Sequence, residues 1–250
     1  MVNSEGSFYS GPVGLTNKHV AVVGSSRRIG LYLTEKLLES GCKVSGLYRT
    51  PSPELTSLKS LFPDRLHLDC FDLRDVRTAG PLAAKIHQQN GRIFGVIHVA
   101  SQFFKTPLGQ VTSNAWDELF DTNVKGHFFL TQALAPYLEA PSHLINLVDI
   151  FSTKPLRNYL AYTAAKGALM TLTRNLANEL APNTRVNAIS PGPVLLPEGF
   201  SEEEKLQYSK NTLLGRTGDP SDIWSAVHFL LNSNYITGIN LCVDGGSFLM

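Results

Sequence analysis

Short apolar runs alternate along the chain with segments whose apolar residues recur every three or four positions. Several of the runs are apolar throughout, which is typical of strands covered on both faces of a parallel sheet. This pattern predicts strands over residues 19–24, 43–48, 65–68, 93–100, 143–149, 185–190 and 240–243.

The periodic segments between these runs predict helices. In RIGLYLTEKLLESG, Ile29, Leu33 and Leu37 recur every fourth residue, and Gly41 marks the end. Similar stripes predict helices over residues 116–138 and 160–180, and a further helix carries Ile223, Val227, Leu230 and Leu231 after an N-cap at Asp219 or Ser221.

Strand and helix in alternation along the whole chain predict an α/β fold. We expect a single-domain, Rossmann-type, doubly wound parallel sheet of about seven strands with helices on both faces. Residues 1–18 are small and polar and are expected to be a flexible leader, which leaves residues 19–250 as the domain. The Pro- and Gly-rich stretch at about 191–220 is expected to be a functional loop, since long irregular segments in compact domains usually are.

Composition narrows the classes of function. The net charge of +1, without a basic run or zinc-spaced Cys/His set, argues against nucleic-acid binding. Cys42, Cys70 and Cys242 are far apart and odd in number, which favours reduced thiols in a cytoplasmic protein. The first residues do not read as a secretory signal, and no apolar run is long enough to span a bilayer.

The first predicted strand runs into the sequence GSSRRIG and then into a helix. Gly24 and Gly30 bracket a turn whose amides and helix N-terminus suit a diphosphate, although a plain tight turn has the same appearance. Dinucleotide sites for NAD usually carry an acid after the second strand. Here no acid lies between Gly41 and Pro53, and Arg49, with Thr50 and Arg27, favours a 2′-phosphate.

A second candidate motif, YTAAK, places Tyr162 and Lys166 four residues apart on one helix face. A tyrosine normally has a pKa of about 10. A nearby ammonium favours the phenolate, so we expect Lys166 to lower the pKa of Tyr162. A solvated helix face is the plainer interpretation of such a pair.

Together these motifs resemble the short-chain dehydrogenase/reductases over essentially the full length of the chain. The matching features are the glycine loop, TNVKG with Asn123, the Tyr162–Lys166 pair, SPGP and the VDGG near the end. The resemblance implies that Tyr162 donates a proton during hydride transfer and that Lys166 also holds the nicotinamide ribose.

Three departures from that family pattern narrow the resemblance. His98 and Val99 replace two asparagines, and no threonine follows the Pro191–Gly192 loop. Asp149 stands thirteen residues before Tyr162, where the family has a serine. Asp149, an arginine in the glycine loop (Arg28) and an aromatic residue in ASQFFKTPL (Phe103) resemble the branch of pteridine reductases and dihydromonapterin reductases.

That resemblance implies NADPH as cofactor, a pterin as substrate, a homotetramer and no metal. The implied catalytic residues are Asp149, Tyr162, Lys166 and Asn123. The implied cofactor residues are Gly24, Ser26, Arg27, Arg28, Ile29, Gly30, Tyr48, Arg49, Thr50, Asp72, Leu73, Ala100, Ser101, Tyr162, Lys166, Pro191, Gly192 and Val194. The implied substrate residues are Arg28, Ser101, Phe103, Asp149 and Tyr162, with Phe103 stacking on the pterin ring.

Asp149 is the residue on which the substrate class depends. Reduction of a carbonyl group requires a neutral hydrogen-bond donor beside the developing oxyanion. A pterin instead presents ring nitrogens and N–H groups, which suit a carboxyl group. The alternative is a buried structural acid paired with an arginine or with backbone amides. Three functions therefore remain: a pterin or dihydropterin reductase, active also on dihydrofolate; a ketone or 3-oxoacyl reductase; and a catalytically silent NADP-binding sensor.

Overall fold

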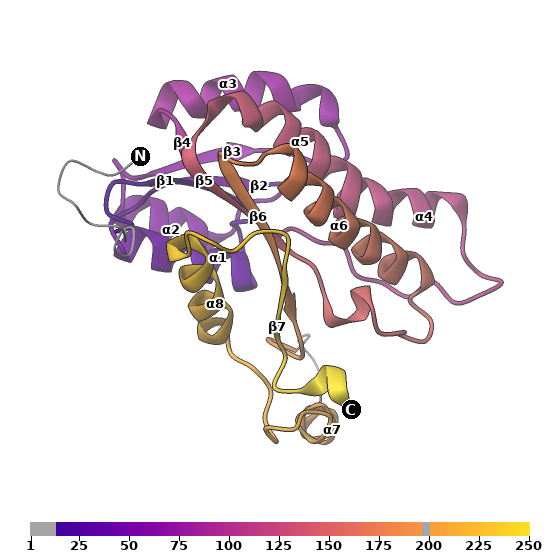
Figure 1. Ribbon diagram of the computed structural model, residues 1–250. Coiled ribbons are helices and arrows are strands. Elements are labelled where there is room, and N and C mark those ends of the chain that lie inside the picture. Colours follow the sequence, from indigo (N-terminus) through magenta and orange to yellow (C-terminus); the bar gives the residue numbers. More distant parts are fainter. Residues whose placement is uncertain (1–13, 197–200) are drawn as a thin grey trace.

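The computed structural model describes residues 14–196 and 201–250, and its centre is one parallel seven-stranded sheet (Figure 1). The strand order is β3-β2-β1-β4-β5-β6-β7. The strands are β1 His19–Val23, β2 Lys43–Tyr48, β3 Leu66–Cys70, β4 Ile93–His98, β5 Leu138–Leu147, β6 Thr184–Pro191 and β7 Asn240–Val243. The expected α/β fold is confirmed.

Helices cover both faces of the sheet because the buried side chains of each strand alternate between them. On β1, Val20 and Val22 pack in one core cluster, and Ala21 and Val23 in the other. One face carries α1 Arg28–Glu39, α2 Pro53–Leu61 and α8 Pro220–Asn232. The other carries α3 Ala79–Asn90, α5 Gly126–Leu134 and α6 Leu160–Glu179, with α4 Ser113–Phe120 packed on α6.

The strand order reverses between β1 and β4, which are hydrogen-bonded neighbours although two strands separate them in the chain. In such sheets the connections on either side of the reversal leave to opposite faces, and a crevice opens at the carboxyl ends of the strands. The fold therefore places the loops after β1 and β4 on the two walls of one crevice.

Several element bounds differ from those expected. The stripe over 116–138 is not one helix: α4 begins at Ser113, a π-helical turn covers Asp121–Lys125, and α5 ends at Leu134 before Pro136, which cannot donate a backbone hydrogen bond. Strand β4 ends at His98 rather than at residue 100. Strand β5 ends at Leu147 rather than at 149, so Asp149 follows the strand.

The loop expected over residues 191–220 contains a helix, α7 Glu202–Lys210, which begins with the acidic residues of that segment. Residues 197–200 of this stretch lie outside the described residues, as do residues 1–13 of the expected leader. The rest of the leader packs against the domain: Leu15 is buried in the core, and the thiol of Cys42 donates to its carbonyl oxygen.

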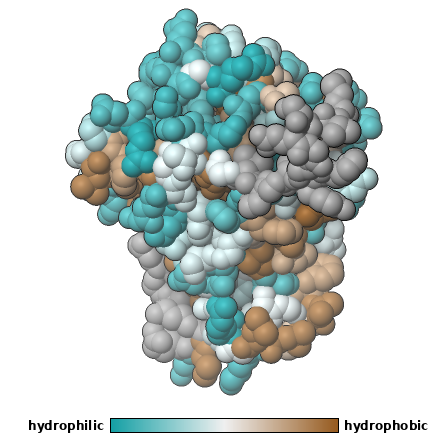
Figure 2. Space-filling model, turned by 60° about the vertical axis from the view of Figure 1, so that its left-hand side comes forward, coloured by the Kyte–Doolittle hydropathy of each residue, from teal (hydrophilic) through white to brown (hydrophobic). Residues whose placement is uncertain are grey.

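The surface carries apolar side chains at one end of the molecule. In Figure 2 they gather at the lower end, where Figure 1 places α7 and the C-terminus. The exposed apolar residues of this part of the chain are Leu206, Leu213, Leu214, Phe248, Leu249 and Met250. Within the described ranges, no helix has both the length and the hydrophobicity that crossing a bilayer requires.

Candidate active site

A cavity of about 880 Å³ opens at the carboxyl ends of the strands, where the strand order predicts a crevice. Its walls come from the loops after β1, β2, β3, β4, β5 and β6 and from the first half of α6. All of the residues expected to contact a cofactor or substrate line this cavity, and of the expected catalytic residues only Asn123 does not.

The loop after β1 approaches its neighbours too closely to carry side chains at two positions. Gly24 has φ +96°, and a Cβ there would lie 2.7 Å from the amide nitrogen of Ala100. A Cβ on Gly30 would lie 1.9 Å from the carbonyl oxygen of Gly24. Helix α1 begins after Arg27, whose side chain makes no cap hydrogen bond, and its first turn holds no acid. The backbone N–H groups at the start of α1 therefore suit a diphosphate.

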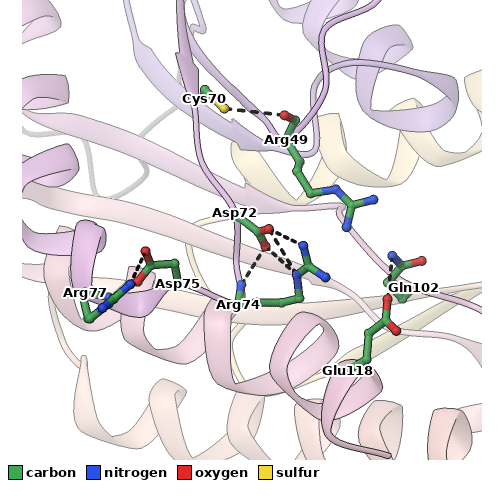
Figure 3. A network of polar contacts seen from close by, with 8 residues as sticks. All are labelled: Arg49, Cys70, Asp72, Arg74, Asp75, Arg77, Gln102 and Glu118. Carbon is green, nitrogen blue, oxygen red and sulfur yellow. Dashed lines mark hydrogen bonds and ion pairs between the residues drawn. The ribbon is translucent and has the colours of Figure 1, made fainter. Parts of the chain in front are cut away.

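Arg49 lies at the end of β2, where a dinucleotide would place its adenosine (Figure 3). Asp72, the nearby carboxylate, is bonded by Arg74 at 2.6 Å, while the guanidinium of Arg49 makes no ion pair among the described residues. Arg74 lowers the pKa of Asp72 most, and Arg49 lowers it further. Arg49 is thus available to an anionic group.

Asp149 and Tyr162 form the central pair of the cavity. The hydroxyl of Tyr162 donates to Oδ2 of Asp149 at 2.5 Å, and the amide of Phe151 donates to Oδ1 at 2.9 Å. Asp149 is the cap of the short 3-10 turn Ile150–Ser152. Both carboxyl oxygens therefore have partners, which explains how a carboxyl group is tolerated directly after an apolar strand.

Burial raises the pKa of the Asp149 carboxyl, against the lowering effect of the Phe151 amide, Tyr162 and Lys166. Burial also raises the pKa of Tyr162 well above its usual value, and the adjacent Asp149 raises it further. The expectation that Lys166 lowers the pKa of Tyr162 is wrong for this structure. The phenol faces a carboxyl group, and the ammonium lies 5.9 Å from the ring centroid.

Lys166 is buried at the back of the cavity, one helical turn beyond Tyr162. Its ammonium donates to the carbonyl oxygen of Leu147, the last residue of β5, at 3.0 Å. Burial lowers the pKa of Lys166 to about 8, and the Asp149 carboxylate opposes this lowering. A lysine in this state can exchange a proton near neutral pH.

Asn123 lies behind the cavity wall, in the π-helical turn between α4 and α5. Its Oδ1 accepts from the Ser101 hydroxyl at 2.6 Å and from the Gln102 amide at 3.1 Å, and its Nδ2 donates to the Gln102 carbonyl at 3.0 Å. In this structure Asn123 holds the wall after β4 in place and does not itself reach the cavity.

Aromatic side chains form the outer wall of the site. Phe103, which is 49% exposed, stacks on Tyr159 with ring centroids 4.5 Å apart and meets Tyr162 edge-on at 4.7 Å. Thr106 holds this arrangement, because its amide donates to the Asn158 carbonyl and its hydroxyl accepts from the first turn of α6. The wall offers a flat apolar face to a planar ligand.

The loop after β6 closes the remaining side. A Cβ on Gly192 would lie 2.6 Å from Cα of Asp244, so this turn requires a glycine. The guanidinium of Arg28 donates to the carbonyl oxygen of Leu195, and both residues line the cavity. Arg28 and Leu195 have φ of 54° and 50°, a left-handed conformation that non-glycine residues seldom adopt.

Sequence reasoning missed some residues of this site. Tyr159, the N-cap residue of α6, lies three positions before Tyr162 and also lines the cavity. Gln102 follows Ser101 in the wall, and Tyr208 reaches the cavity from α7.

The described residues contain no cluster of three or more His, Cys, Asp or Glu side chains that could hold a metal ion.

Comparison with known proteins places the chain in a family. Residues 23–247 match the family model described as enoyl-(acyl carrier protein) reductase, a short-chain dehydrogenase/reductase family. The dihydromonapterin reductase of Klebsiella pneumoniae is 30% identical over 91% of this chain and 95% of its own length. A short-chain dehydrogenase/reductase of Arabidopsis thaliana, SDRA, is 32% identical over 94% and 96%.

A solved structure shares the fold: a blue fluorescent protein from a metagenomic library, in complex with NADPH, aligns with a TM-score of 0.87 at 25% identity, over 94% of this chain and 99% of its own. The family match spans nearly the entire sheet, and the glycine turn, the Tyr162–Lys166 pair and the crevice lie within it. The chain therefore belongs to the short-chain dehydrogenase/reductase superfamily of oxidoreductases.

Proposed function

We propose that this oxidoreductase uses NADPH to reduce a pterin or dihydropterin, and dihydrofolate as a further substrate, to the tetrahydro form. The observation that carries the proposal is the 2.5 Å hydrogen bond from Tyr162 to Asp149 inside the cavity. The name of the Klebsiella relative, dihydromonapterin reductase, agrees with this substrate class.

The chemistry of Asp149 favours a ring that contains nitrogen. Reduction of a C=N bond needs a hydride at carbon and a proton at nitrogen, and neighbouring ring N–H groups can donate to a carboxylate. A carbonyl group would instead develop negative charge that an ionised Asp149 would repel. The flat wall of Phe103 supports a planar aromatic substrate.

NADPH bound along the glycine turn would supply the hydride. Tyr162 is protonated near neutral pH, because its pKa is raised, and would give its proton to a ring nitrogen. Asp149 accepts from the Tyr162 hydroxyl and can hold a proton itself, since its own pKa is also raised. Lys166, whose pKa is about 8, can return a proton to this pair between turnovers.

Several features fit NADPH better than NADH. Arg49 has no carboxylate partner among the described side chains, and no acid follows β2 to accept from ribose hydroxyls. Arg27 and Arg28 also line the cavity without ion pairs in the described ranges. Three arginines near the adenosine and diphosphate ends favour the extra phosphate of NADP(H).

Reduction of an ordinary ketone or a 3-oxoacyl thioester is the second candidate. One observation favours it: burial raises the pKa of Asp149 and so favours its protonated form, and a protonated carboxyl group could donate to an oxyanion as a serine does. The matching family model is described as an enoyl reductase, which reduces a C=C bond, so its description does not decide between the two candidates.

One experiment separates the two candidates. NADPH consumption by the purified enzyme is followed against dihydropterins with different side chains, dihydrofolate, simple ketones and a 3-oxoacyl thioester. We expect turnover with dihydropterins and none with simple ketones. Turnover of carbonyl substrates alone would establish the second candidate, and NADPH binding without turnover of any substrate would indicate a sensor.

We also propose a homotetramer in the cytoplasm. Trp116 on α4, Phe129 on α5 and Leu160 on α6 are partly exposed, and the apolar C-terminal end supplies a second surface. Two different apolar surfaces on one chain suit two kinds of two-fold contact, which together give a tetramer.

The side chain of the substrate would be selected by the segment after Pro191, where Gln207, Tyr208 and Asn211 reach the cavity.

A further inference from the structure

Two buried histidines join the end of β4 to the start of α5, behind the cavity wall. His98 is the last residue of β4, and His127 is the second residue of α5. Their Nδ1 atoms are 2.8 Å apart, and the rings meet at 70°. Both side chains are almost fully buried, and neither lines the cavity.

The hydrogen bonds of this pair can run in only one direction. The carbonyl of Ala100 can only accept, so Nε2 of His127, at 2.9 Å from it, must carry a hydrogen. Burial lowers the pKa of His127 to about 3, and the charge of Lys166 lowers it as well, so the ring is neutral and its Nδ1 is an acceptor.

The same reasoning assigns His98. Because Nδ1 of His127 accepts, Nδ1 of His98 must donate. Burial lowers the pKa of His98 well below its usual value, so this ring is also neutral, and its Nε2 accepts from the Thr131 hydroxyl at 2.8 Å. A single chain therefore runs from Thr131 through His98 and His127 to Ala100.

This chain ends on the wall segment that Asn123 also holds. His127 lies one helical turn beyond Asn123, so both side chains project from the same side. His127 bonds Ala100, and Asn123 bonds Ser101 and Gln102. Two side chains thus fix three consecutive wall residues that follow β4.

Burial of this histidine pair costs free energy unless every hydrogen bond of the two rings is made. Two imidazoles buried without charge each lose hydration and must have every hydrogen bond satisfied, whereas an apolar pair would pack without this requirement. Ala100 also borders Gly24, with the would-be Cβ of that glycine 2.7 Å from the Ala100 amide. A small shift of Ala100 would therefore change the wall opposite the glycine turn.

We propose that His98 and His127 are positioning residues for hydride transfer. Their directed hydrogen-bond chain sets the place of Ala100, and through it the part of the cavity wall that borders the glycine turn, where the cofactor would lie. The inference rests on the proposed use of NADPH but not on the pterin substrate.

The first test reads the tautomers in the wild-type protein by ¹⁵N-detected NMR of the imidazole rings. We expect the hydrogen of His127 on Nε2 and that of His98 on Nδ1, from neutral pH to pH 5. A hydrogen on Nδ1 of His127, or a charged ring in that range, would overturn the proposal. This measurement needs neither cofactor nor substrate, so it stands even where the proposed function fails.

The second test compares two substitutions at one position. In His127→Gln the amide can replace the Nε2 donor to Ala100, whereas in His127→Asn the side chain is too short to reach it. We expect His127→Asn to weaken NADPH binding and to lower kcat/KM about tenfold, the effect of one unsatisfied buried hydrogen bond, and His127→Gln to recover most of the loss.

The matched control is His19→Gln, at a buried histidine that begins β1 and bonds Ser45, away from the cavity. It is expected to lower the melting temperature without changing NADPH affinity or kcat. Equal NADPH affinity and kcat/KM in wild type, His127→Asn and His127→Gln would show that the histidine pair only stabilises the fold. If neither variant folds, the proposal is tested by the tautomers of His98 and His127 in the wild-type protein.

Discussion

The Tyr162 hydroxyl donates a 2.5 Å hydrogen bond to Asp149, and the pKa of each group is raised by burial. The raised pKa keeps the proton on the phenol, and burial makes the carboxyl group bind a proton more readily than an exposed aspartate does, so the pair is suited to proton transfer. A serine in place of Asp149 would leave the phenol a neutral partner that does not titrate.

Asp149→Ser tests whether this carboxyl group serves a pterin. We expect pterin turnover to fall by roughly 10²-fold, the lower range for a proton-transfer group, while NADPH affinity stays within a few-fold. Weak activity on ketones is the expected gain. A purely structural Asp149 would give a lower melting temperature with an unchanged rate per folded molecule, so both quantities are measured on the same preparation.

Tyr162→Phe removes the proposed proton donor without changing the shape of the ring. We expect kcat to fall by roughly 10²–10⁴-fold, with little change in NADPH affinity. Tyr235→Phe, at a fully exposed tyrosine, is the control and should retain the wild-type rate. A Tyr162→Phe enzyme with more than about a tenth of the wild-type kcat would assign the proton transfer to another group.

Arg49→Ala tests cofactor choice. Loss of a charged hydrogen bond to the 2′-phosphate should cost about 1.5–3 kcal/mol of NADPH binding and leave NADH binding nearly unchanged. Arg77→Ala is the control, because Arg77 is exposed, pairs with Asp75 and does not line the cavity (Figure 3). An unchanged ratio of NADPH to NADH affinity in Arg49→Ala would contradict the assignment.

The fold was predictable because strands buried on both faces leave an unambiguous apolar pattern. The bounds of β5 were not: the apolar run continues through Val148, but pairing with β6 ends at Leu147. The break between α4 and α5 was also missed, because apolar periodicity persists through the π-helical turn that carries Asn123. Periodicity reports which side chains are buried, not where the backbone hydrogen bonds change pattern.

The site could be predicted where its residues lie close together in the sequence. Tyr162 and Lys166 share a helix, and the glycine turn is contiguous in sequence, so their placement needs no tertiary information. The pKa of Tyr162 was wrongly expected to fall, because the sequence does not reveal that its hydroxyl faces Asp149. The contact of His98 with His127 joins residues 29 positions apart and could not be inferred from either alone.

Assembly provides a further prediction. The partly exposed apolar side chains on α4, α5 and α6 would be covered in a tetramer, so light scattering at micromolar concentration should give the mass of four chains. Trp116→Glu places a charge on that surface and should yield smaller species, whereas Glu139→Gln, at an ion pair with Lys18 elsewhere, should not. A monomeric wild-type protein would contradict the proposal.

Acid should destabilise the fold well before the carboxylates are protonated. Burial lowers the pKa of His19 from 6.5 to about 4 and that of His127 and His143 to about 3, and it lowers that of His98 as well. The folded state holds these rings neutral, while the unfolded chain protonates them below about pH 6.5. Each histidine therefore stabilises the fold fully above that pH, and the contribution is lost as the pH falls toward 3.

The loss should amount to a few kcal/mol for each histidine, on the order of 1.4 kcal/mol for every pH unit by which its pKa is lowered. Asp149 acts in the opposite direction, because acid relieves the cost of its buried charge, but it is one group against four. The urea midpoint should therefore fall steeply between pH 6.5 and 4. In His19→Gln one titrating group is absent, so the slope should be shallower by about one proton. A midpoint that stays flat down to pH 4 would show that these histidines are protonated in the folded protein.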